Sequence, residues 1–368
     1  MGKPEIRFQG YTEDWEQRKL SSFCNYVSSS LTAKDIDDNG RYDLYDANIL
    51  IGKTNRGCIA ENYITIIKDG AGVGRTRLLP SNSMFLGTMG ALVPNNSDLK
   101  FLHQLIIKAD LSKECTGSTI PHIYFKNYGE NRYFIPTLEE QHQIGAYFSN
   151  LDHLITLHQR KCDETKKLKK YMLQKMFPQN GHSVPEIRFS GFTEDWEQRK
   201  LGDLVDRVTR KNQDLVSELP LTISAQYGLI DQNEFFDKRV ASKDVSSYYL
   251  IENGEFAYNK STSTDAPWGA IKRLDRYENG VLSTLYIVFG IKDNHPVDSD
   301  FLVSYYSTNL WHKGIHEIAA EGARNHGLLN IAPADFFETG LMIPQDIEEQ
   351  KKIGKYFEKL ERLITLHQ

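Results

Sequence analysis

The chain has 368 residues, of which 40% are hydrophobic and 25% charged, and its formal net charge is −5 at pH 7. At roughly 150 residues per domain, this length predicts two or three domains, each able to bury a core. The composition excludes fibrous and wholly disordered chains, and the negative charge means that nucleic-acid binding must rest on local basic patches. The sequence has no run of about 18 apolar residues, so no membrane span is predicted, and the first residues lack the apolar region of a secretory signal. The four cysteines indicate reduced thiols, and we therefore expect a cytoplasmic protein.

An internal repeat is the most informative feature of the sequence. Residues 4–20 read PEIRFQGYTEDWEQRKL and residues 185–201 read PEIRFSGFTEDWEQRKL, so fifteen of seventeen positions are identical. Residues 139–159 (EEQHQIGAYFSNLDHLITLHQ) and residues 348–368 (EEQKKIGKYFEKLERLITLHQ) share fourteen of twenty-one positions. The chain is therefore a duplication of two units in the same order, which predicts pseudo-two-fold symmetry.

Each unit contains a variable block, residues 21–135 and 202–343, in which the same elements are predicted in the same order. An apolar strand runs into a Gly- or Ser-rich turn, a second apolar run and a short helix follow, and an Ile-Pro pair ends the block. In chain order these are YITIIKDGAGVG, Met84–Val93, Asp98–Ala109 and Ile135-Pro136 in the first block, and GEFAYNKSTSTDAPWG, Val281–Phe289, Ser299–Trp311 and Ile343-Pro344 in the second. The interspersed strands and helices predict an α+β fold class, with two mixed α/β domains built on β-sheet cores.

A long helix is predicted from about Leu138 to Met176, ending before Pro178. Its apolar residues alternate by four and three positions, an average of 3.5 that is typical of a coiled-coil seam. The seam consists of Ile144, Phe148, Leu151 and Ile155, and it recurs in the final helix as Ile353, Phe357, Leu360 and Ile364. We expect the two copies to pair as an antiparallel coiled coil. A helix of about 23 residues is roughly 34 Å long, so such a pair would hold the two blocks about one turn of B-DNA apart.

Three motifs suggest site chemistry, but a simpler interpretation is preferred for each. Residues 47–54 fit a relaxed P-loop pattern without its Gly-rich cradle, so we predict a strand there. The Gly70–Gly74 segment follows a strand but is misspaced for dinucleotide binding, which favours a hairpin turn. His312 and His316 have helical spacing without a third ligand nearby, so we assign no metal site.

Motifs of catalysis are absent from the sequence. The chain contains no Pro-Pro, Pro-Cys or Pro-Asp dipeptide. This removes the motif of adenine methyltransferases and the nucleophile motif of cytosine-C5 methyltransferases, and it argues against a common divalent-metal nuclease pattern. We therefore assign no catalytic residue.

The Gly70–Gly74 turn is also a candidate DNA contact, because Lys68, Arg75 and Arg77 flank it. Small residues let a backbone approach closely, and guanidinium groups suit phosphates and guanine edges. A solvated, charged hairpin is the alternative, and the sequence leaves both interpretations open.

The repeated segments PEIRF(Q/S)G(Y/F)TEDWEQRKL and EEQ…IG.YF..L..LITLHQ closely resemble the two conserved regions of type I restriction-modification specificity subunits, over the whole chain. The resemblance implies that each variable block is a target recognition domain that reads one half of a split, asymmetric DNA site. It also implies that the helices set the spacer and dock two modification subunits, which methylate adenine with S-adenosylmethionine, and that two ATP-driven restriction subunits can join. No cofactor is then expected on this chain, and S-adenosylmethionine, ATP and Mg are expected in the partner subunits of a bacterial cytoplasmic complex.

On this basis the chain divides into six segments. They are a conserved N-terminal segment (1–20), a first target recognition domain (21–135), a central conserved helix (136–177), a linker with the second conserved segment (178–201), a second target recognition domain (202–343), and a distal conserved helix that is apparently truncated (344–368). The first helix continues nearly twenty residues past Gln159, whereas the second copy stops at Gln368. We therefore expect Arg160–Met176 to lack a partner.

The two recognition domains differ in charge. The first holds twelve basic and eleven acidic residues, a net +1, and the second holds thirteen and twenty, a net −7. An acidic DNA reader must gather its bases on one face. The candidate DNA-binding residues are Lys68, Arg75, Arg77, Thr119 and His122 in the first domain, and Lys260, Ser261, Thr262, Lys272, Arg273, Arg324 and Asn325 in the second.

Two other functions stay open at this stage. A scaffold that pairs two enzyme subunits without touching DNA fits the negative charge and the missing catalytic motifs. A self-contained methyltransferase conflicts with the missing Pro-Pro motif.

Overall fold

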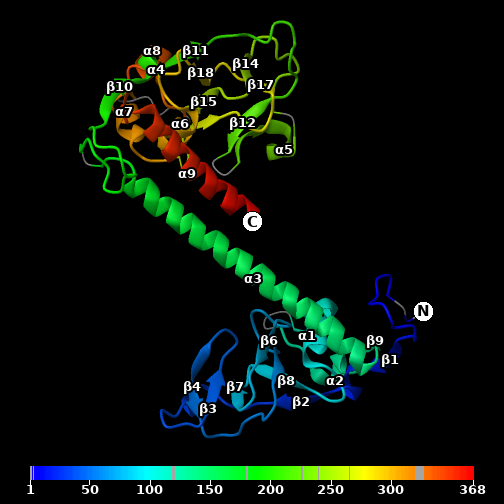
Figure 1. The fold of residues 1–368 in the computed structure, drawn as a ribbon. Coiled ribbons are helices and arrows are strands. Elements are labelled where there is room, and N and C mark those ends of the chain that lie inside the picture. Colours follow the sequence, from blue (N-terminus) through cyan, green and yellow to red (C-terminus); the bar gives the residue numbers. More distant parts are fainter. Residues whose placement is uncertain are drawn as a thin grey trace. The chain divides into compact units, whose positions relative to one another are not determined.

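The structure is a computed structural model that describes residue 2 and residues 4–117, 121–179, 181–224, 227–238, 240–264, 266–319 and 327–368. The chain forms two compact units, Met1–Leu157 and His158–Gln368. The boundary lies inside α3 (Leu138–Lys175), a helix of 38 residues (Figure 1). Both units combine sheets with helices, which confirms the predicted α+β fold class. Within the described ranges, no helix is both long and apolar enough to cross a membrane.

Unit 1 is built on a four-stranded antiparallel sheet in the order β2-β8-β5-β6. All five residues of β5 are buried, as expected for a central strand of β-branched and aromatic residues. A separate three-stranded sheet in the order β4-β3-β7 belongs to the same unit. These strands are β2 (Cys24–Ser28), β3 (Tyr42–Tyr45), β4 (Leu50–Thr54), β5 (Tyr63–Ile67), β6 (Thr76–Leu79), β7 (Ser83–Phe85) and β8 (Met89–Pro94). The strand predicted within residues 47–54 is thus confirmed as β4.

Helix α1 (Leu99–Ala109) packs its apolar face into the same core. The carboxylate of Asp98 accepts a hydrogen bond from the backbone N–H of Phe101 and so caps the helix start. The helix agrees with the predicted range Asp98–Ala109. The remaining elements of unit 1 are β1 (Glu16–Lys19), η1 (Leu20–Ser22), η2 (Ala33–Asp35), η3 (Leu111–Glu114), α2 (Phe125–Tyr128) and β9 (Arg132–Ile135).

Unit 2 repeats this plan with a four-stranded antiparallel sheet in the order β11-β18-β15-β16. Two antiparallel two-stranded sheets, β12-β13 and β14-β17, accompany it. The strands are β10 (Glu197–Lys200), β11 (Val205–Val208), β12 (Leu221–Ser224), β13 (Gly228–Asp231), β14 (Tyr249–Glu252), β15 (Phe256–Asn259), β16 (Ala270–Arg273), β17 (Asn279–Leu282), β18 (Ile287–Ile291) and β19 (Gly340–Ile343). The helices are α4 (Leu201–Leu204), α5 (Gln232–Phe236), α6 (Ser299–Tyr305), α7 (Trp311–Ile318), α8 (Pro333–Phe337) and α9 (Ile347–Leu366). The single helix predicted over Ser299–Trp311 is therefore wrong: α6 ends at Tyr305 and α7 begins at Trp311.

The first repeated segment forms the same two contacts in both units. Its last residues pair with the strand before the long helix, as β1 with β9 in unit 1 and β10 with β19 in unit 2. Its arginine forms a bidentate ion pair with a fully buried glutamate of that helix. Arg7 Nε and Nη2 each donate to Glu140 at 2.7 Å, and Arg188 donates to Glu349 at 2.7 and 2.8 Å. A buried carboxylate requires such a bidentate partner, which explains why this arginine and this glutamate occur in both copies.

The second repeated segment fastens each helix to its unit through one glutamine. Gln141 Oε1 accepts the backbone N–H of Asp98, and its Nε2 donates to the carbonyl of Pro136. Gln350 makes the corresponding bonds to Asp298 and Pro344. Both glutamines are 2% exposed, so the bonds satisfy polar groups that water does not reach.

A glycine lets each of these helices approach its neighbour closely. A Cβ on Gly145 would lie 2.8 Å from the backbone nitrogen of Phe101 in α1, and a Cβ on Gly354 would lie 2.8 Å from that of Phe301 in α6. These distances are too short for any side chain. The IG dipeptide in both helix copies therefore encodes this helix contact.

Helix α9 lies antiparallel to the C-terminal half of α3 inside unit 2. Cys162 Sγ approaches the carbonyl of Ile364, and Lys169 forms an ion pair with Glu361. Further along, the rings of Phe177 and Phe357 have centroids 5.9 Å apart. As the residue numbers of α3 rise, those of its partners fall, which is the antiparallel order.

This arrangement corrects two expectations about the helices. Arg160–Met176 was expected to lack a partner, but it lies against α9. The apolar seams of the two repeat copies were expected to pack on each other. Instead, the apolar stripe that forms the seam of α9 is buried against α6 and against the part of the chain after Gln159, where the first copy ends. That stripe is Ile353, Phe357, Leu360 and Ile364, each at most 6% exposed.

The equivalent stripe in unit 1 is only partly covered. Ile144 packs against the core of its unit, whereas Phe148, Leu151 and Ile155 are 43%, 36% and 54% exposed. The same sequence pattern is thus buried in unit 2 and partly exposed in unit 1. In unit 2 the C-terminal half of α3 packs over the copy in α9.

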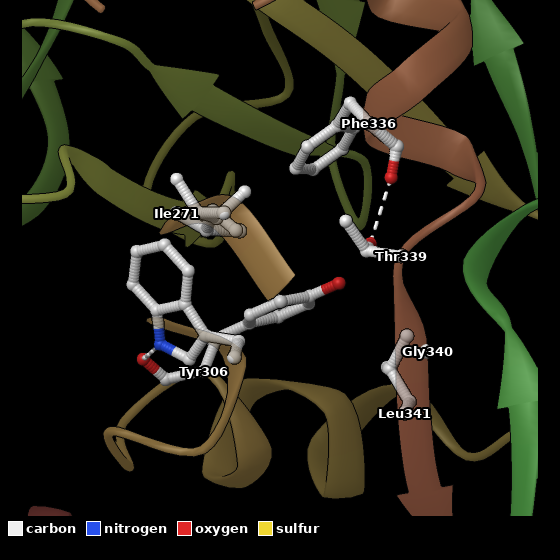
Figure 2. Close-up of a pocket in the computed structure, with 8 residues that line it drawn as sticks. Ile271, Tyr306, Phe336, Thr339, Gly340 and Leu341 are labelled. Atoms are coloured by element: carbon white, nitrogen blue, oxygen red, sulfur yellow. Dashed lines mark hydrogen bonds between the residues drawn. The ribbon is translucent and has the colours of Figure 1, made fainter. Parts of the chain in front are cut away.

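A small cavity lies in the core of unit 2 and is shown in Figure 2. Its volume is about 10 Å³, and aromatic and aliphatic side chains such as Ile271 and Phe336 line it. The hydroxyl of Thr339 donates to the carbonyl of Phe336 at 2.7 Å, so this polar group of the wall already has a partner. A space of this size holds no more than one water molecule, and we interpret it as a packing gap.

Candidate nucleic-acid interface

The β5–β6 hairpin turn of unit 1 requires glycine for its shape. Gly70, Gly72 and Gly74 have φ of +87°, +84° and +85°, which side chains with a Cβ rarely adopt. The backbone N–H of Ile67 donates to the carbonyl of Arg75 and closes the turn. The predicted hairpin is confirmed, and no helix follows the glycines as dinucleotide binding would demand.

A second segment of unit 1 is fastened along this turn. The N–H of Gly70 donates to the carbonyl of Pro121, and the N–H of Ile123 donates to that of Lys68, each at 3.0 Å. Between them, His122 exchanges two backbone hydrogen bonds of 2.9 Å with Thr116. The turn and residues 121–123 therefore form one hydrogen-bonded surface.

The side chains of this surface form a polar and aromatic row. His122 Nδ1 lies 2.7 Å from Asp69 Oδ1, and the two side chains are 34% and 35% exposed. The His122 ring stacks on Tyr124 with centroids 6.3 Å apart, and the Lys126 ammonium lies 5.4 Å from the Tyr124 ring centroid. An accessible row of this kind can donate, accept and stack, which is what recognition of a base edge requires.

The predicted arginines beside the turn are held by neighbouring groups. Arg75 donates to the Asn48 side-chain oxygen at 2.6 Å, and the Arg77 guanidinium lies 5.2 Å from the centroid of the Tyr45 ring. Lys68 is half-buried at the start of the turn. Thr119 lies outside the described residues.

The β15–β16 hairpin of unit 2 is built in the same way. The N–H of Thr262 donates to the carbonyl of Gly327 at 2.6 Å, and the N–H of Leu329 donates to that of Lys260 at 3.0 Å. Ser261 and Leu328 form the bridge between these bonds. Ser261 and Thr262 are thus brought to the turn, whereas Arg324 and Asn325 lie outside the described residues.

The other predicted cations of unit 2 face elsewhere. Arg273 is 17% exposed and paired with Asp275 and Asp300. Lys272 is half-buried near Lys169 and Glu361, and its partial desolvation lowers the pKa of its amine.

Lys260 is half-buried at the start of the β15–β16 turn, and its Nζ lies 3.4 Å from the carbonyl of Ile331. Burial lowers the pKa of its amine as well. Of the three lysines and arginines predicted in the described part of this domain, only Lys260 belongs to the turn.

Histidines 312 and 316 pack on tryptophans instead of gathering ligands. The His312 ring centroid lies 4.5 Å from that of Trp311, and the His316 ring centroid lies 5.0 Å from that of Trp268. Burial lowers the pKa of His312. Among the residues that the structure describes, no three His, Cys, Asp or Glu side chains gather as metal ligands.

Sequence reasoning missed Asp69, Tyr124 and Lys126 as members of the unit 1 surface. Tyr124 stands two residues after His122, and this spacing in extended backbone places both side chains on one face. That alternation was the available signal. Asp69 had no comparable signal, because its partner lies 53 residues away.

Comparisons with known proteins agree with the geometry. Residues 12–167 match the family described as the type I restriction modification DNA specificity domain. The chain is 29% identical over 212 residues to the type I restriction enzyme MjaVIII specificity subunit of Methanocaldococcus jannaschii, covering 53% of this chain and 50% of that protein. It is 24% identical over 226 residues to the putative MjaX specificity subunit of the same organism, covering 52% of each. The chain thus spans about half the length of these curated relatives in each match.

A solved structure resembles the whole fold. It is the S subunit of a type I restriction-modification system from M. genitalium, with a TM-score of 0.62, 15% identity, and coverage of 99% of this chain and 93% of that one. The family match places a DNA specificity domain of the type I restriction-modification class across most of unit 1. Over residues 12–167 the chain is therefore similar to the DNA specificity domain of type I restriction-modification systems, and its fold resembles that of a type I S subunit.

Proposed function

We propose that the chain is the sequence-specific DNA-recognition subunit of a type I restriction-modification complex, in which each unit reads one half of a bipartite, asymmetric site. One observation carries the proposal. In both units a segment from later in the chain is bonded to the hairpin turn through equivalent hydrogen bonds, while the side chains on the two turns differ. Two different readers on one scaffold suit a site whose halves differ in sequence.

The long helices are proposed to set the spacer between the half-sites and to dock two methyltransferase subunits. Support comes from the open stripe of unit 1, where Phe148, Leu151 and Ile155 present apolar surface on α3. The chain itself acts without catalysis. Adenine-N6 methylation with S-adenosylmethionine, and ATP- and Mg-dependent cleavage by two restriction subunits, belong to the partners in this proposal.

One observation favours the scaffold alternative. The second recognition domain carries a net charge of −7, and Arg273 is neutralised by two aspartates. A scaffold that never touches DNA needs no basic face. Under the DNA-recognition proposal, the modification subunits supply much of the phosphate contact.

The deciding experiment expresses the full chain with its methyltransferase partner and maps methylated adenines across a genome. The expected result is one gapped motif with methylation in both halves. A continuous motif would refute bipartite reading, and methylation that does not depend on this chain would refute DNA recognition.

A binding series separates the scaffold alternative. True phosphate contacts give a linear fall of log affinity with log salt concentration, with a slope of about −0.9 per contact. If adding the chain changes neither the slope nor the sequence preference of the methyltransferase, the scaffold alternative is correct.

A further inference from the structure

The hydrogen bonds align the two hairpin turns residue by residue, although their sequences do not match. Ile123 donates to Lys68 at 3.0 Å in unit 1, and Leu329 donates to Lys260 at 3.0 Å in unit 2. These bonds make the two lysines equivalent.

The next bond of each turn extends this alignment. Gly70 donates to Pro121 in unit 1, and Thr262 donates to Gly327 in unit 2. The residues enclosed between the two bonds are bridged in both units, as Asp69 with His122 and as Ser261 with Leu328.

The enclosed pair differs in chemistry between the units. In unit 1 it consists of a carboxylate and an imidazole joined at 2.7 Å. In unit 2 it consists of an exposed hydroxyl and a half-buried leucine. The lysine that precedes the pair is the same in both. A shared cation next to a changing pair is the pattern expected where the backbone of DNA is held in one way and its bases are read in two.

Backbone bonds on both sides hold the unit 1 pair rigidly. His122 is fixed by two bonds to Thr116 and flanked by the bonds at Pro121 and Ile123. Its Nδ1 is engaged by Asp69, and in the described part of the chain no hydrogen-bond partner occupies Nε2. A ring that is locked in orientation and 34% exposed presents this second nitrogen to a ligand without further ordering.

Resting on the proposed DNA recognition, we propose that residues 122 and 328 occupy equivalent specificity-determining positions of the two half-site readers. His122 Nε2 forms a hydrogen bond with a base edge of the first half-site. Leu328 makes an apolar contact with a thymine methyl group of the second. Asp69 is a positioning residue that fixes the imidazole, and Lys68 and Lys260 contact phosphate.

The test maps the methylated motif of the full chain with its methyltransferase partner, for wild type and for His122→Ala and Leu328→Ala. We expect His122→Ala to reduce discrimination about five- to tenfold at one position of the first half and to leave the second half unchanged. Leu328→Ala should do the converse. Asp69→Leu should relax the same position as His122→Ala, and Asp69→Asn, which keeps an acceptor oxygen, should restore it.

His142→Ala is the matched control, because His142 Nδ1 also lies 2.7 Å from an aspartate, Asp98, in the same unit but away from the turn. It should leave the motif unchanged. A wild-type motif that is retained by His122→Ala, or discrimination lost equally at all positions, overturns the inference. A thermal melt checks folding, and His122→Gln replaces the alanine variant if that variant unfolds, with the same expected relaxation. If the wild-type complex itself shows no gapped motif, the proposed function fails rather than the assignment of these positions.

Discussion

The repeat places two equivalent phenylalanines in different environments. Phe357 of α9 and Phe148 of α3 occupy the same position of the second repeated segment, nine residues after its first glutamate. Phe357 is 3% exposed and packs on Phe177, whereas Phe148 is 43% exposed. Truncation of each to alanine therefore tests whether α3 covers only the second copy.

We expect Phe357→Ala to lower the free energy of unfolding of unit 2 by about 3–5 kcal/mol, the usual cost of emptying a buried phenylalanine site. Phe148→Ala should cost about 1 kcal/mol, because much of its ring is already in water. With a urea m-value of about 2–3 kcal/mol/M, the Phe357→Ala variant should lower the midpoint of unit 2 by about 1–2.5 M.

Tryptophan fluorescence during urea unfolding provides the assay. Three of the four tryptophans, Trp196, Trp268 and Trp311, lie in unit 2, so the signal reports mainly on that unit. Far-UV circular dichroism of the same samples follows both units, since a chain of two units need not unfold in one step. Equal losses for the two variants would refute the reasoning, because the covering role of α3 predicts a clear inequality.

The remaining predictions concern buried charge in unit 2. Arg188→Ala leaves the fully buried Glu349 carboxylate without its partner and should lower the free energy of unfolding by about 3–5 kcal/mol in the same urea assay. A double variant, Arg188→Met with Glu349→Leu, should recover most of this loss. A double variant as unstable as Arg188→Ala would contradict this account. Burial lowers the pKa of Lys272, so the folded state binds fewer protons than the unfolded state between that lowered pKa and the ordinary value of 10.5, and unit 2 should gain stability as pH rises through this window. Lys272→Met should raise the urea midpoint at neutral pH and remove this gain. Parallel pH profiles for wild type and variant would argue against a lowered pKa of the Lys272 amine in the folded state.

Local patterns in the sequence were sufficient for much of the architecture. The duplication, the long helix, the strand at residues 47–54 and the Gly70–Gly74 hairpin all follow from identity, periodicity and turn chemistry, which act over a few neighbouring residues. The positions of the repeated Arg, Glu, Gln and Gly residues were also visible in the sequence. Their roles in bonding each helix to its unit were not, because those roles depend on contacts between distant segments.

Tertiary structure alone decided which copy of the helix is covered and which polar residues meet. The stripes in α3 and α9 are nearly identical in sequence, yet only the second is buried, since burial depends on the neighbouring segment and not on the stripe. Likewise, Asp69 and His122 are 53 residues apart, and Arg273 meets Asp300 only because α6 folds back beside β16. Periodicity reports the face that a residue occupies, while the partner on that face is set by the packing of the whole unit.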